Sequence, residues 1–289
     1  MAGILAETPE TATTNMVLVG LPNDSQSSFR RGPASGPAWI RRAYDGACYN
    51  ASTEMGLDLT RVAADLGDWP SLATWEQTYQ SYLTKAVDLF GKNRLPFFLG
   101  GDHAVSVPIV EALGRLSRPV HVIQFDAHPD LYQAYEGNPH SHATTGYRIL
   151  SMEHVASLTM IGIRAITRDQ LDTAENHKDR LHIIPARRLG PHLPPLPHIP
   201  AEALVYLTID LDAFDPSYAP GVSHPVPGGL TSRQVFDFIQ DLPWTLIGMD
   251  VVELNQDRDL NDLTAVLAGG LIHEAMGLAF RQRKKACST

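Results

Sequence analysis

Two aspartates and a histidine lie within one five-residue segment, as Asp126, His128 and Asp130. In an extended backbone, residues two positions apart project to the same side, and Pro129 interrupts the strand and turns the last aspartate towards the other two groups. The segment follows the apolar run 120–125, where such a concentration of charge is costly without a cation. We therefore predict a metal site here; a solvated acidic loop is the alternative.

Two other segments offer donors of the same kind. His103 follows an apolar run and a pair of glycines, which allow a tight turn. A turn in which Asp102 caps a helix is the alternative reading of that segment. Asp210 and Asp212 follow a third apolar run, and their spacing places both carboxylates on one side of an extended chain. The candidate ligands are His103, Asp126, His128, Asp130, Asp210 and Asp212.

The chemistry of these six side chains indicates the kind of metal. Imidazole and carboxylate donors without a thiolate favour a pair of Mn(II)-like ions over structural zinc. Two ions about 3.5 to 4 Å apart clamp a water-derived nucleophile at neutral pH. The pattern therefore predicts a hydrolase with a binuclear metal centre.

Short apolar runs alternate with segments of helical spacing, which is typical of an α/β fold with a parallel sheet. Strands are predicted at 16–19, 96–99, 120–125, 159–163, 204–209 and 246–252. Helices are predicted at 37–44, 75–90, 105–114, 167–175, 232–241 and 261–280. Ligands bind at the carboxyl ends of the strands in such sheets, and the candidate ligands follow predicted strands.

We expect one domain over residues 1–289, with 1–15 as a flexible N-terminal arm and the proline-rich stretch 190–200 as a surface connection. The net charge of -9 argues against a nucleic acid or an anionic membrane as a partner and favours a cationic substrate. Cys48 and Cys287 show no metal or redox spacing, and no signal sequence is evident. The apolar stretch 265–280 falls short of a membrane span. These features predict a cytoplasmic protein.

The segments described above resemble the motifs of the ureohydrolase family, which includes arginase, agmatinase, guanidinobutyrase and formimidoylglutamase. They are Gly-Gly-Asp-His at 100–103, Asp-Ala-His-Pro-Asp at 126–130 and the long stretch T-I-D-L-D-A-F-D-P-S-Y-A-P-G-V-S-H-P-V-P-G-G at 208–229. The likeness covers residues 16–277. It implies a three-layer α/β/α sandwich around a mostly parallel sheet, the arginase-like fold, assembled as a homotrimer or homohexamer.

The resemblance also implies which residues bind the metals. One manganese ion would be bound by His103, Asp126, Asp130 and Asp210, and the other by Asp126, His128, Asp210 and Asp212. Two Mn²⁺ ions per subunit are thus expected, with Asp126 and Asp210 bridging them. Nickel fits the same ligands and is the alternative metal.

Further roles are implied for residues of two other motifs. Glu253, in the segment 249–255, matches the glutamate that holds the guanidinium group. The segment 138–144 resembles the loop whose histidine moves protons, with His142 the better match and His140 the alternative. Asp130, His142 and Glu253 are therefore the expected catalytic residues. The expected substrate-binding residues are Glu253, His142, Tyr132 and Asn138.

The implied reaction cleaves a C–N bond of a small guanidino compound to give urea and an amine. Tyr132 stands where arginases have a small amide, and Ala165, Ile166 and Thr167 follow the Ile-Gly-Ile-Arg segment where arginases have acids. Both departures favour an agmatinase-like enzyme over an arginase. Guanidine, guanylurea or a biguanide are alternative substrates.

Three other functions stay open at this point. The Glu253-Leu254-Asn255 segment also resembles formimidoylglutamase, which would release formamide. A non-catalytic subunit that assembles with a paralogous chain is the alternative outside enzymes, although no candidate ligand is missing. A deacetylase-like amide hydrolase with one zinc ion is a further alternative, and two metals per subunit would argue against it.

Overall fold

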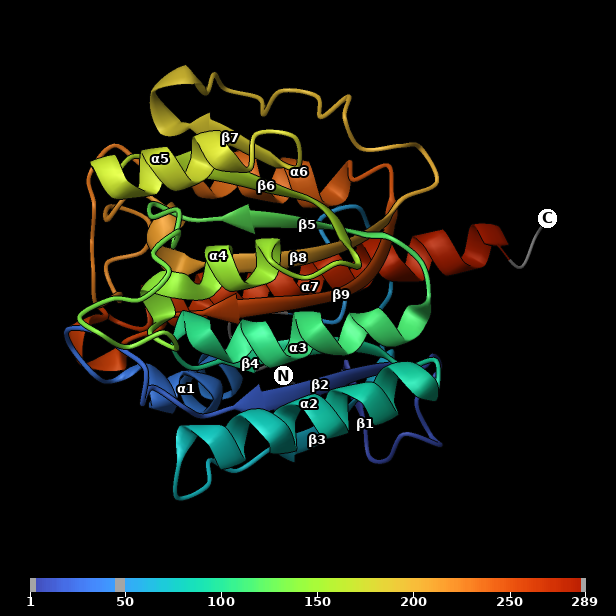
Figure 1. Ribbon diagram of the computed structural model, residues 1–289. Coiled ribbons are helices and arrows are strands. Elements are labelled where there is room, and N and C mark those ends of the chain that lie inside the picture. The colour runs from blue at the N-terminus through green and yellow to red at the C-terminus, as the bar shows by residue number, and fades with distance from the viewer. Residues whose placement is uncertain (1–3, 45–49, 287–289) are drawn as a thin grey trace.

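The computed structural model describes residues 4–44 and 50–286. Within these residues a single parallel sheet of nine strands is present, with the order β1-β3-β2-β4-β9-β8-β5-β6-β7 (Figure 1). The strands are β1 (Leu5–Ala6), β2 (Met16–Leu21), β3 (Ala63–Asp68), β4 (Leu95–Gly100), β5 (Val120–Phe125), β6 (Val155–Ile163), β7 (Leu181–Pro185), β8 (Leu204–Asp210) and β9 (Thr245–Val252). The predicted α/β fold with a parallel sheet is confirmed. Cys48 and Cys287 lie outside the described residues.

Helices cover both faces of the sheet, which gives three layers (Figure 1). They are α1 (Gly36–Ala43), α2 (Trp75–Gly91), α3 (Ser106–Ala112), α4 (Thr145–Leu150), α5 (Arg168–Asn176), α6 (Ser232–Gln240) and α7 (Leu263–Ala286). Side chains of successive strand residues point to opposite faces, so the sheet contributes to two apolar cores. In β4, for example, Phe97 belongs to the core that includes residues of α1, α6 and α7, while Phe98 belongs to the core that includes residues of α2 and α3.

The six predicted strands are all present, and three more were not predicted. The sequence of β3, Ala-Ala-Asp-Leu-Gly-Asp, lacks an apolar run, and β1 has only two residues. β7 is an edge strand that ends in a proline, a residue tolerated at edges. The short helix α4 was also missed.

The N-terminal segment departs from the expected flexible arm over residues 1–15. β1 pairs with β3, and Ile4 is fully buried in the core. The apolar side chains at this end therefore hold residues 4–6 against the sheet.

Helix α7 corrects the expectation that the stretch 265–280 is too short to span a membrane. Its residues Leu263–Lys284 are long and apolar enough to cross one, but 83% of the most apolar window is buried inside the fold. Both His273 and Glu274 are buried with it. Helix α7 packs between the sheet and α6, which accounts for its apolar composition.

Candidate metal centre

The candidate ligands follow three strands that lie close together in the sheet. His103 comes after β4, and the segment 126–130 comes after β5. Asp210 is the last residue of β8, and Asp212 follows it. β9, which is followed by Glu253, lies between β4 and β8. The sheet order β4-β9-β8-β5 therefore brings the four chain segments to one edge of the sheet, as expected for parallel strands.

The turn after β4 depends on a close approach between two backbones. A side chain at Gly101 would place its Cβ 1.8 Å from the carbonyl oxygen of Asn23, so only glycine fits there. The next residue, Asp102, donates its amide hydrogen to the same oxygen and caps the short turn that contains His103. The two interpretations of this segment are therefore compatible: Asp102 caps the turn, and the same turn places His103 at the site.

The six candidate ligands form two overlapping clusters. In the first, Nδ1 of His103 lies 3.2 Å from carboxylate oxygens of both Asp126 and Asp130 and 3.5 Å from one of Asp210. In the second, Nδ1 of His128 lies 2.9 Å from Oδ2 of Asp212 and 3.7 Å from Oδ1 of Asp126. Asp126 faces both histidines, each with a different oxygen. These groups have the spacing of metal-binding sites.

The hydrogen bonds of His103 fit a cation at the first cluster. The hydroxyl of Thr208 donates to Oδ1 of Asp250 at 2.6 Å, so it can only accept from Nε2 of His103, 3.0 Å away. Nε2 then carries the hydrogen, and in the neutral ring Nδ1 carries a lone pair. This buried Nδ1 has no hydrogen-bond partner and faces three carboxylates. A lone pair directed at carboxylates is repulsive unless a cation lies between them.

The charges in the cluster support the same conclusion. Burial would lower the pKa of His128, but Asp212 and Asp126 raise it to about 12. Burial raises the pKa of Asp130 to about 6, with the neighbouring Asp126 carboxylate acting in the same direction. The carboxylates thus attract a positive charge strongly. A divalent cation would replace the protons that they otherwise hold on the histidines.

Two residues of the site have an unusual backbone conformation. Asp130 and Glu253 have φ angles of 51° and 69°, in the left-handed region that non-glycine residues seldom adopt. The amide of Glu253 donates to the carbonyl of Gly101 at 2.8 Å, and the carbonyl of Asp130 accepts from Tyr147 at 3.0 Å. These contacts hold both residues in conformations that turn their side chains into the site.

His142 and Glu253 form a buried ion pair beside the clusters. Nδ1 of His142 lies 2.8 Å from Oε1 of Glu253, and the same oxygen accepts from the amide of His103 at 2.8 Å. Nε2 of His142 lies 2.8 Å from the hydroxyl and 3.1 Å from the amide of Ser28. Burial would lower the pKa of His142, but the Glu253 carboxylate raises it to about 9. The amide of Ser28 can donate to Nε2 only in the neutral ring, whereas in the protonated ring Nε2 can donate to the Ser28 hydroxyl.

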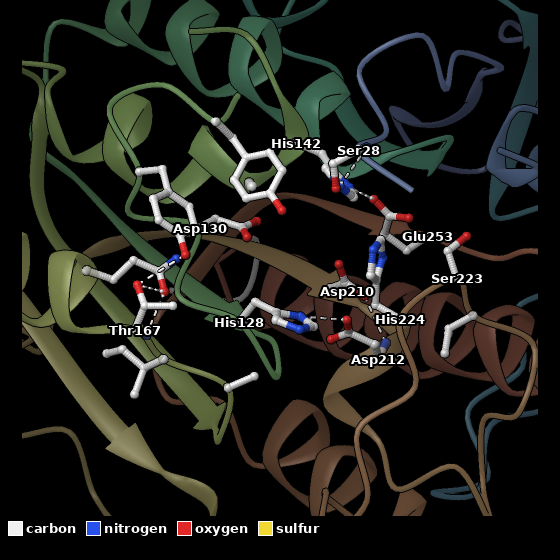
Figure 2. Close-up of a pocket in the computed structure, with 17 residues that line it drawn as sticks. Ser28, His128, Asp130, His142, Thr167, Asp210, Asp212, Ser223, His224 and Glu253 are labelled. Atoms are coloured by element: carbon white, nitrogen blue, oxygen red, sulfur yellow. Dashed lines mark hydrogen bonds and ion pairs between the residues drawn. The ribbon is translucent and has the colours of Figure 1, made fainter. Parts of the chain in front are cut away.

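A cavity of about 400 Å³ opens above these groups (Figure 2). Asp130, Asp210, Asp212, His128, His142 and Glu253 all line it, whereas His103 and Asp126 lie beneath, fully buried. Ser28 reaches the cavity from the loop after β2. The site is thus a pocket with a potential metal centre at its floor.

The structure places the other predicted residues differently. Tyr132 lines the cavity, whereas Asn138 does not, because its amide donates to Gln26 and its backbone pairs with Tyr135. His140 contacts Arg148 in a separate hollow. Of the two candidate histidines, only His142 therefore reaches the site.

Sequence reasoning missed His224 as a site residue. It lines the cavity, and its ring lies 5.4 Å from that of His142 and 6.0 Å from that of His128, measured between centroids. Its position within the long motif at 208–229 was the available signal. The contact of Ser28 with His142 was also not predicted, since these residues lie 114 positions apart.

Comparisons with known proteins point to one family. Residues 14–277 match the model described as "Arginase family". The chain is 35% identical over 277 residues to mitochondrial arginase 1 of Arabidopsis thaliana, covering 91% of this chain and 80% of that protein. It is 31% identical over 281 residues to an agmatinase of Bacillus subtilis, with 94% of each chain covered. The structure of agmatine ureohydrolase from Thermoplasma volcanium matches with a TM-score of 0.84 and 28% identity, covering 98% of this chain and 94% of that one.

Proposed function

Since the chain belongs to the arginase family, we propose that it hydrolyses a small cationic guanidino compound to urea and an amine. It is a hydrolase of C–N bonds in linear amidines, as members of this family are. One observation supports the proposal most strongly: His103, Asp126 and Asp210 form one potential metal site, and Asp126, His128 and Asp212 form an adjoining one. Glu253 lies beside both at the cavity wall.

The six side chains would hold two divalent ions. We assign His103, Asp126, Asp130 and Asp210 to one ion, and Asp126, His128, Asp210 and Asp212 to the other. Manganese is the proposed metal, and nickel is the alternative that the same donors accept. When bound, such a pair of ions supplies a nucleophile at neutral pH and stabilises developing negative charge.

The remaining residues would bind the substrate and move protons. Glu253 holds the guanidinium group through a carboxylate that currently pairs with His142. The raised pKa of His142 keeps this ring protonated at neutral pH, so it delivers a proton to the departing amine. Asp130 lies at the floor of the cavity, where its carboxylate takes part in the same proton transfer.

The identity of the guanidino compound is not decided by the relatives, because both an arginase and an agmatinase are similar to the chain. Tyr132 and Thr167 line the cavity at positions where the sequence departs from arginases, which supports a substrate without an α-amino acid head. This choice requires an assay.

The test is to purify the chain alone, load it with Mn²⁺ or Ni²⁺, and measure urea from a panel of guanidino compounds. The panel contains arginine, agmatine, guanidine, guanylurea and a biguanide. We expect urea from at least one. Formamide from formimidoylglutamate, with no urea from any compound, would replace the proposed reaction. Metal-loaded protein without activity until a paralogous chain is added would indicate a heteromeric enzyme.

Two further expectations concern the protein as a whole. Family members are commonly oligomers, and we propose a homotrimer or homohexamer, which light scattering on the purified protein would test. We also propose a cytoplasmic location, which fractionation of the source cells would test.

A further inference from the structure

The cavity has a charged end and an uncharged end. Its carboxylates belong to Asp130, Asp210, Asp212 and Glu253, all of which belong to the metal clusters or the guanidinium position. One part of the lining carries no charged side chain; we call it the uncharged wall, and it consists of Tyr132, Tyr135, Ala165, Ile166, Thr167 and Gln170. Figure 2 shows Thr167 on the opposite side of the pocket from Glu253, with His128 between them. A guanidinium group held by Glu253 would therefore direct its tail towards the uncharged wall.

Tyr132, Thr167 and Gln170 of this wall are joined by hydrogen bonds. The hydroxyl of Tyr132 donates to Oγ1 of Thr167 at 3.1 Å, and Thr167 donates from Oγ1 and from its amide to Oε1 of Gln170, at 3.3 and 3.0 Å. The Tyr135 ring packs against that of Tyr132 at 5.3 Å. The hydroxyl of Thr167 thus both accepts and donates a hydrogen bond within the wall. The surface that meets the tail is aromatic and neutral.

We propose that the substrate carries an uncharged tail, and that Thr167 is the position that determines this specificity. The inference rests on the proposed hydrolysis of guanidino compounds and narrows its substrate class. The preferred compounds are alkyl- or aryl-substituted guanidines rather than guanidino amines or guanidino acids.

A cationic tail lacks a counterion at this end. An ammonium group loses its hydration on entering the pocket and needs a carboxylate to compensate. Among the described residues that line the cavity, every carboxylate lies at the metal and guanidinium end. The faces of Tyr132 and Tyr135 offer only a weaker attraction to a cation.

An anionic tail has no basic partner at the uncharged wall either, because His128 and His142 lie with the carboxylates at the metal and guanidinium end. The lining of the cavity, as far as the structure describes it, contains no lysine or arginine. Arg168 follows Thr167 in the chain, but it is highly exposed and paired with Asp172. The N-terminus of α5 begins beside Thr167 and would attract an anion, yet Asp169 in its first turn opposes this.

The test uses three guanidines that share a four-carbon chain and differ only at its end. They are butylguanidine with a neutral methyl end, agmatine with an ammonium group, and 4-guanidinobutyrate with a carboxylate. We measure kcat/KM from urea release and, separately, binding to the Mn²⁺-loaded protein by calorimetry. Butylguanidine should exceed both others at least tenfold in each measurement. Equal or tighter binding of either charged compound would overturn the inference.

A matched pair of variants tests Thr167 itself. Thr167→Asp introduces the missing carboxylate, and Thr167→Asn introduces a neutral group of the same size. Aspartate and asparagine are both favoured before a helix, so α5 is retained in each. For each variant we take the ratio of kcat/KM for agmatine to kcat/KM for butylguanidine. This ratio should be at least tenfold higher in Thr167→Asp than in Thr167→Asn. An equal ratio in the two variants would overturn the role of Thr167.

The calorimetric measurement separates this inference from the proposed function. If urea forms from none of the three compounds but butylguanidine binds most tightly, the proposed reaction is wrong, and the preference of the uncharged wall for an uncharged tail is retained. If urea is released and a compound with a charged tail is preferred, the proposed reaction is retained and the preference for an uncharged tail is wrong. If the metal-loaded protein binds none of the three compounds, the preference for an uncharged tail is also wrong.

Discussion

Nδ1 of His142 lies 2.8 Å from Oε1 of Glu253, so the proposed proton donor and the proposed guanidinium ligand form one ion pair. A guanidinium group that binds Glu253 competes for the carboxylate that raises the pKa of His142. Substrate binding would therefore make His142 a stronger acid at the moment when the departing amine needs a proton. Ser28 holds the other ring nitrogen and keeps the ring in position.

The pH dependence of the reaction should report this pair. The pKa of His142 is raised to about 9, so the ring stays protonated below that pH and loses its proton above it. We expect kcat/KM to fall as the pH rises through about 9. His142→Asn should lower kcat by roughly 10² to 10⁴ and remove this decline. A decline that persists unchanged in His142→Asn would exclude His142 as its source.

Glu253→Gln tests the other member of the pair. Removing the charge should cost about 2–5 kcal/mol of interaction with the guanidinium group, a loss of at least roughly 30-fold in kcat/KM. The pKa of His142 should also fall in this variant, which histidine NMR would measure. Metal content serves as the control and should not change, because Glu253 is not assigned as a ligand. Unchanged kinetics with metal bound would remove Glu253 from the site.

The hydroxyl of Thr208 should control metal affinity without touching the metal. It accepts from Nε2 of His103 and donates to Asp250, which fixes the ring orientation and the position of its hydrogen. Thr208→Val should weaken metal binding about 10- to 100-fold. Thr208→Ser retains the hydroxyl and should bind metal nearly as well as the unaltered protein. Competition with a metal-chelating dye measures both, and equal affinities for the two variants would contradict this positioning role.

The sequence predicts the central strands and the metal cluster for the same physical reason. β5 and β8 are mostly apolar and buried on both faces, and an aspartate follows β5 directly and ends β8. Such an abrupt change is visible without a structure. β3 could not be recognised, because its acidic residues and glycine give no apolar run, although pairing with β2 stabilises it.

The parts of the site that come from loops were harder to predict. His224 enters the cavity from the segment between β8 and α6, and Ser28 from the loop after β2. Their positions depend on contacts such as that between Ser28 and His142, which no local pattern shows. Asn138 illustrates the opposite error, since its motif was recognised but its side chain bonds to Gln26 instead of lining the cavity.

A group of histidines away from the site should make stability depend on pH. The rings of His182 and His198 stack at 3.6 Å, and Thr159 contacts His198 at 2.7 Å. Burial, with His182 and His121 acting in the same direction, lowers the pKa of His198 to about 4. The unfolded chain binds a proton near pH 6.5, so stability present above that pH is lost as the pH falls towards 4.

Urea denaturation between pH 7.5 and 5 measures this loss. We expect His198→Gln to reduce the dependence of the unfolding free energy on pH over this range. Excess Mn²⁺ in all samples limits the contribution of the metal site. An identical pH dependence in the variant and the unaltered protein would rule out His198 as a contributor.

The metal centre itself is tested most directly by anomalous diffraction from crystals of the Mn²⁺-loaded protein. We expect two peaks per subunit, about 3.5 to 4 Å apart, with Asp126 in contact with both. The other ligands should be His103, Asp130, Asp210, His128 and Asp212. A single peak, or two peaks away from these side chains, would contradict the binuclear centre on which the proposed reaction depends.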